Sequence, residues 1–167
     1  VVIMSYYPNQ HNPQTRWDMR YKFVSDIIKL LIGLGESSIN LKIKDGLGNK
    51  NEAESYEKYF ALTGINPSSI NIIYGESSEA IASASYIIGQ ASTACFESAI
   101  LKKKYYIYEP IENGTTDEML NSTIADINDV PRTIIELRLA LMNGKSLVFK
   151  EKKYLVDGEP LNQITFV

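Results

Sequence analysis

Short apolar runs alternate with segments of helical periodicity over the first 110 residues of this chain. Between residues 24 and 34, apolar side chains recur at spacings of three and four, which places them on one face of a helix. Residues 39–44 instead alternate between apolar and polar side chains, as a half-buried strand does. The whole pattern predicts five strands, at residues 1–7, 39–43, 70–74, 86–89 and 105–108.

Helices are predicted between these strands and after the last of them. Ser77 or Ser78 can cap one helix, Ser92 and Thr93 can open the next, and Pro131 can begin the last. Glycines and Asn-Gly pairs mark where helices end. The predicted helices span residues 17–33, 53–63, 77–84, 92–103 and 131–143.

This alternation predicts an α/β protein. We expect a Rossmann-like parallel sheet of five strands, or slightly more, with helices on both faces. Residues 1–146 would form this domain, and residues 147–167 a tail or arm that packs on it or on another domain. In such sheets, ligands bind beyond the carboxyl ends of the strands, where the strand order reverses.

Composition narrows the classes of function. The chain has 167 residues, enough for one domain, and 17 Lys and Arg against 20 Asp and Glu argue against a nucleic-acid partner. A single cysteine, Cys95, excludes an internal disulfide, and one His with one Cys cannot form a His/Cys metal cluster. The single cysteine fits a reducing compartment, so we expect a cytoplasmic protein. No apolar stretch has the roughly 18 residues of a transmembrane span, so none is predicted. Because a strand pattern begins at Val1, we expect the chain to be part of a longer protein.

The segment from Tyr86 to Pro110 carries the candidate chemistry. A strand runs into Gly89, small residues follow, and Ser92 and Thr93 open a helix. Unpaired N–H groups and the positive end of the dipole let a helix N-terminus bind phosphate. Glu97 lies on the same helix face as Thr93, one turn on, where a carboxylate can accept from ribose hydroxyls. The alternative is a capped core helix with Glu97 on its surface.

The order strand, Gly-x-x-Ser-Thr-x-x-x-Glu, strand resembles the carboxyl-terminal domain of GT-B glycosyltransferases, most closely those that build bacterial surface polysaccharides. It is also similar to nucleotide-sugar 2-epimerases and to polyol-phosphate polymerases of the teichoic acid type. The resemblance implies a donor site that starts at Gly89, with Ser92 and Thr93 on the phosphate and Glu97 on the ribose. It implies a nucleotide sugar as substrate, a glycan or lipid-linked acceptor, and no cofactor or metal. It also implies an N-terminal domain or partner subunit, and activity at the inner face of the membrane through other parts of the protein.

The loop after the first strand holds further candidates. Arg16 and Arg20 are four residues apart and share a helix face, an arrangement that suits a diphosphate or a carboxylate. Solvated charges with Asp18 as a partner are the alternative. His11, the single histidine, is a candidate general base, although a lone histidine in a loop is more often exposed.

Three functions are therefore compatible with the sequence. The first is the nucleotide-sugar-binding half of a GT-B glycosyltransferase, which would by itself bind nucleotide weakly and transfer nothing. The second is a nucleotide-sugar 2-epimerase-like domain, which needs further carboxylates and a histidine such as His11 near the sugar. The third is a non-catalytic flavodoxin-like module for binding or assembly.

Overall fold

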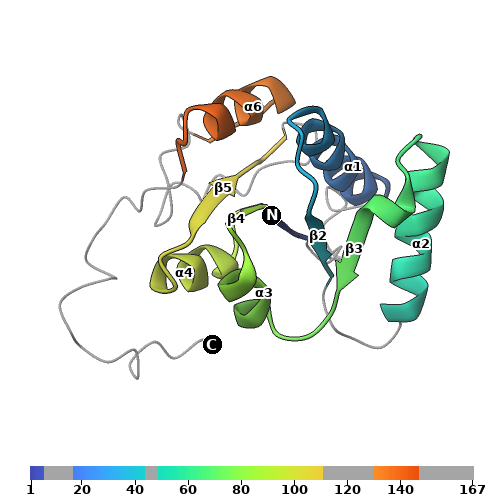
Figure 1. The fold of residues 1–167 in the computed structure, drawn as a ribbon, viewed down its shortest axis with the longest axis horizontal. Helices are drawn as coiled ribbons and strands as arrows, with labels where there is room; N and C mark the ends of the chain where they lie inside the picture. The colour runs from blue at the N-terminus through green and yellow to red at the C-terminus, as the bar shows by residue number, and fades with distance from the viewer. Residues whose placement is uncertain (6–16, 44–48, 111–129, 147–167) are drawn as a thin grey trace.

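A five-stranded, all-parallel sheet forms the centre of the molecule (Figure 1). The computed structural model describes residues 1–5, 17–43, 49–110 and 130–146. The strand order is β3-β2-β1-β4-β5, so the chain runs outward from β1 to one edge and then crosses to the other side of β1. The predicted Rossmann-like α/β fold is confirmed. The strands are β1 (Val2–Met4), β2 (Ile39–Lys42), β3 (Ile70–Ile73), β4 (Tyr86–Gly89) and β5 (Lys104–Ile107).

Helices cover both faces of this sheet, as predicted (Figure 1). Helices α1, α2 and α6 pack on one face, and α3 and α4 pack on the other. None of the helices in the described ranges has the length and apolarity needed to cross a bilayer. The helices are α1 (Trp17–Gly33), α2 (Asn49–Leu62), α3 (Ser77–Ser83), α4 (Thr93–Ile100) and α6 (Ile134–Met142), with a 3₁₀ turn, η2, at Pro67–Ser69.

Strands β1 and β4 are apolar on both sides because each side faces a helix layer. In β1, Ile3 packs toward α1 and α2, whereas Val2 and Met4 pack toward α3 and α4. Strand β2 is different, since only Ile39 and Leu41 belong to an apolar cluster. Its alternate residues are polar, and they face the side of the sheet on which α3 and α4 lie.

Several helix boundaries differ from the prediction. Helix α2 begins at Asn49, four residues before the predicted start. Helix α4 ends at Ile100 because Lys102 adopts a left-handed φ of 53° and Lys104 already pairs with Tyr86 in the sheet. Glu76, rather than a serine, occupies the N-cap of α3, without a side-chain capping bond. Helix α6 begins at Ile134 because the side chain and backbone of the preceding Thr133 form a capping box with Glu136.

Candidate functional site

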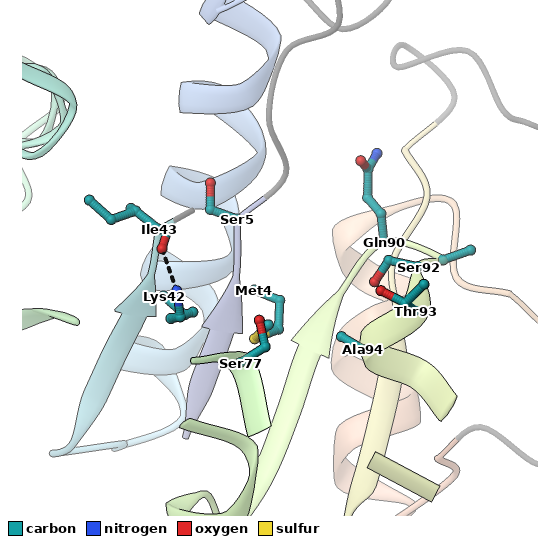
Figure 2. A pocket seen from close by; sticks show the side chains of 10 residues that line it. Met4, Ser5, Lys42, Ile43, Ser77, Gln90, Ser92, Thr93 and Ala94 are labelled. Carbon is teal, nitrogen blue, oxygen red and sulfur yellow. Dashed lines mark hydrogen bonds between the residues drawn. The ribbon is translucent and has the colours of Figure 1, made fainter. Parts of the chain in front are cut away.

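A pocket opens at the carboxyl edge of the sheet, between β1 and β4, where the strand order reverses (Figure 2). Its volume is about 300 Å³. This is the location at which open α/β sheets bind ligands, and the position predicted from the order of elements. The lining comes from four segments, Met4–Ser5, Lys42–Ile43, Ser77 and Gln90–Ala94.

The start of α4 forms one side of the pocket. Ser92 is the N-cap residue, with extended backbone angles (φ −160°, ψ 175°), and its hydroxyl makes no capping hydrogen bond. Figure 2 shows the hydroxyls of Ser92 and Thr93 together at this helix start, with Ser77 across the pocket. Because the positive end of the helix dipole lies here, this side of the pocket favours an anion.

Two buried side chains hold the segment that leads into α4. The hydroxyl of Tyr105 donates to the Gln90 carbonyl at 2.8 Å. The carboxylate of Glu109, beyond the end of β5, accepts from the Ala91 N–H at 2.8 Å and from Gln90 Nε2 at 3.2 Å. These bonds fix the backbone path before the helix, so the position of Ser92 and Thr93 depends on the neighbouring strand β5.

Gly89 lies beneath this segment and is not among the residues that line the pocket. A Cβ at this position would collide with the Tyr105 hydroxyl and lie 3.1 Å from the Cβ of Met4. Gly89 therefore makes room for Tyr105, which in turn holds the loop.

The predicted ribose ligand, Glu97, is half-buried on α4 and does not line the pocket with Ser92 and Thr93. Its Oε2 atom is buried and has no hydrogen-bond partner among the described residues. Burial raises the pKa of Glu97, and the charge of Glu76 raises it further.

Arg20 is fully buried and makes an ion pair with Glu52. Its Nε donates to Ser5 Oγ at 2.8 Å, and its guanidinium lies 5.3 Å from the ring centre of Tyr56. The pKa of Glu52 is raised, because the effect of burial exceeds the opposing effect of the charges of Arg20 and Lys42. Arg20 does not line the pocket itself; it reaches the pocket through Ser5, which does.

Lys42 is a lining residue that the sequence analysis did not select. The strand alternation assigned it to the polar side of β2, where a lysine is ordinarily solvated. In the structure it is 4% exposed, and its Nζ donates to the Ile43 carbonyl at 2.6 Å (Figure 2). The signal that could have found it is its position, since Lys42 is the last residue of a strand next to the reversal point.

Some predicted features lie outside the described residues. His11, Arg16 and the segment 147–167 are among them. Within the ranges that the structure describes, no group of three or more His, Cys, Asp or Glu side chains could hold a metal ion. Cys95 is buried, and burial raises its pKa to about 12, so its thiol stays protonated at neutral pH.

Comparisons of this chain with protein-family models, with curated proteins and with solved structures found no match. The likeness to GT-B glycosyltransferases thus remains a resemblance of motif and element order.

Proposed function

We propose that this chain binds a nucleotide sugar, through its phosphate, in the pocket between β1 and β4. It would act as the donor-binding half of a glycosyltransferase. The observation that carries the proposal is that Ser92 and Thr93, at the N-terminus of α4, line a pocket at the reversal point of the sheet.

The lining suits a phosphate. The helix N-terminus supplies partial positive charge, and the hydroxyls of Ser77, Ser92 and Thr93 supply donors. When the bond between sugar and phosphate breaks, negative charge builds up on the departing nucleotide phosphate. Donors already in place at the helix start would stabilise that charge. The acceptor and the catalytic base would come from an N-terminal domain or a partner subunit.

Thermal unfolding with added nucleotides tests the proposal. CMP, UDP, GDP and their sugars would each be added to the chain, beside the matching nucleosides without phosphate. A ligand at about 100 times its Kd adds about 2.7 kcal/mol to the free energy of unfolding, which raises the Tm by several degrees. We expect a shift with a nucleotide and none with its nucleoside. The absence of a shift at millimolar concentrations would contradict the proposal and favour an assembly module.

A double variant tests the assignment of the phosphate. Ser92→Ala with Thr93→Ala removes both hydroxyls and should weaken nucleotide binding by about 1–3 kcal/mol, the range for hydrogen bonds to a charged group. Ser85→Ala is the control, because Ser85 is exposed before the opposite end of β4 and does not line the pocket. Titration calorimetry measures the nucleotide affinity of each variant and of the wild type. An unchanged Kd in the double variant would contradict the binding of the phosphate at the start of α4.

A further inference from the structure

Lys42 is a buried cation at the edge of the pocket opposite α4. Its side chain is 4% exposed, and its ammonium makes one hydrogen bond, to the Ile43 carbonyl. No carboxylate among the described residues forms an ion pair with it. An ammonium has three donors, and burial without a counter-charge is unfavourable.

The charges around Lys42 do not balance within the described part of the chain. Glu52 is the carboxylate whose pKa responds to the charge of Lys42, but it already forms an ion pair with the buried Arg20. Among the described residues, the charges of Lys42 and Arg20 thus both act on this carboxylate. The other buried carboxylate at this sheet edge, Glu109, follows β5, which lies three strand spacings from β2, or roughly 14 Å. It accepts hydrogen bonds from Gln90 and Ala91 instead.

The pocket thus has two separate groups for anions, on opposite sides. Lys42 stands at the end of β2, and Ser92 and Thr93 stand after β4, with β1 between these strands. Strands two spacings apart are separated by roughly 10 Å, more than a single phosphate spans. A ligand with two linked phosphates can meet both sides at once.

We propose that Lys42 binds the second phosphate of a diphosphate ligand whose other phosphate lies on the start of α4. This inference rests on the proposed function and narrows it, because the nucleotide is then a nucleoside diphosphate rather than a monophosphate. The ligand also supplies the negative charge that balances the buried ammonium.

Calorimetric titration with matched pairs of nucleotides tests this inference. The pairs are UDP with UMP, CDP with CMP and GDP with GMP, and pyrophosphate and phosphate are included without a base. The wild-type chain should bind one diphosphate roughly tenfold to a hundredfold more tightly than its monophosphate, the range of a charge-assisted hydrogen bond. In Lys42→Met, the preference for the diphosphate over the monophosphate should fall to about twofold or less. The affinity for the monophosphate should stay within about twofold of the wild-type value.

Controls separate loss of the ammonium from loss of the fold. Lys58→Met makes the same charge change at an exposed site on α2, and it should keep the diphosphate preference. Without ligand, Lys42→Met should have a Tm no lower than the wild type, because it removes a buried charge that has no ion-pair partner among the described residues. Lys42→Gln serves as the second variant if the methionine does not fold.

Each outcome decides something different. If a nucleoside diphosphate keeps its preference in Lys42→Met, or if wild type binds both members of a pair equally, the role of Lys42 is wrong and the proposed function stands. If no nucleotide binds but pyrophosphate binds in a Lys42-dependent way, the diphosphate site stands and the proposed function is wrong. If neither nucleotides nor pyrophosphate bind, both are wrong.

Discussion

Gly89 shows how one residue next to the pocket is constrained by a neighbour rather than by a ligand. The ring of Tyr105 occupies the space that a side chain at Gly89 would fill, and its hydroxyl holds the Gln90 carbonyl. The sequence analysis placed the start of a donor site at Gly89. In the structure, the Tyr105 hydroxyl occupies the space next to this residue.

Gly89→Ala should lower the free energy of unfolding by about 1–3 kcal/mol, because the added methyl overpacks the core against Tyr105. Urea denaturation measures the change. Gly33→Ala is the control, since Gly33 lies in α1 with no atom within 4 Å of an added Cβ, and alanine there should stabilise the helix by up to about 1 kcal/mol. Adding Tyr105→Phe to Gly89→Ala removes the hydroxyl that the new methyl would contact, so it should restore part of the lost stability. If stability is not restored, the collision with the Tyr105 hydroxyl is not the cause of the loss.

Glu97→Gln should stabilise the protein at neutral pH. The pKa of Glu97 is raised above 4.5, so its ionised form is less favourable in the folded than in the unfolded chain. This penalty is complete at neutral pH, shrinks as the pH falls through the raised pKa, and vanishes below 4.5. We expect the variant to have the higher Tm at about pH 7 and the two proteins to converge near pH 4.

Glu76→Gln should give part of the same gain, because the charge of Glu76 contributes to the raised pKa of Glu97. If the difference in Tm between Glu97→Gln and the wild type does not change with pH, the raised pKa of Glu97 is not its cause.

The ribose role of Glu97 stays a prediction. If it holds, Glu97→Gln weakens the binding of nucleotides and leaves that of phosphate unchanged.

The pairing between helices α1 and α2 depends on a buried ion pair. Arg20 of α1 and Glu52 of α2 are 32 residues apart in the chain, and both are buried. Ser5 connects them to the end of β1, because its Oγ accepts from Arg20 and lies 3.0 Å from the Tyr56 hydroxyl. The elements around the pocket are therefore held together by polar contacts as well as by the apolar core.

Arg20→Met should lower the free energy of unfolding by about 3–5 kcal/mol, because it leaves the Glu52 carboxylate buried without its partner. The double variant Arg20→Met with Glu52→Leu should lose much less free energy of unfolding than the sum of the losses in the two single variants. Lys22→Met is the control, since Lys22 pairs with Asp26 at an exposed site on α1 and should change stability by less than about 1 kcal/mol. If urea denaturation shows that the two single losses add up in the double variant, the energetic coupling between Arg20 and Glu52 is contradicted.

The limits of α4 show where local pattern and sheet pairing compete. The sequence pattern extends this helix to Lys103, because alanine, leucine and lysine all favour helices. In the structure Lys104 pairs with Tyr86, and the three residues before it turn the chain into β5. The end of α4 is therefore set by pairing with a strand that lies elsewhere in the chain. Local helix propensity contains no information about that pairing.

At the scale of the whole molecule, the order of elements and the fold class were predictable from the sequence. Periods of two and of 3.6 residues are properties of the local chain, so the five strands and their helices follow from them. The start of α4 was predictable for the same reason, because glycine and hydroxyl residues mark the end of a strand and the start of a helix. The location of a pocket at the carboxyl edge followed from the general behaviour of parallel sheets.

The amino-acid sequence by itself determined the α/β order, the helices on both faces of the sheet and the position of Ser92 and Thr93 at a helix start. Only the tertiary structure decided that Lys42 is buried at the pocket, that Arg20 pairs with Glu52 and that Tyr105 fills the space at Gly89. The physical reason is the range of the interactions. Periodicity and capping depend on residues within one or two turns, whereas burial and charge pairing depend on residues that the fold brings together from distant parts of the chain.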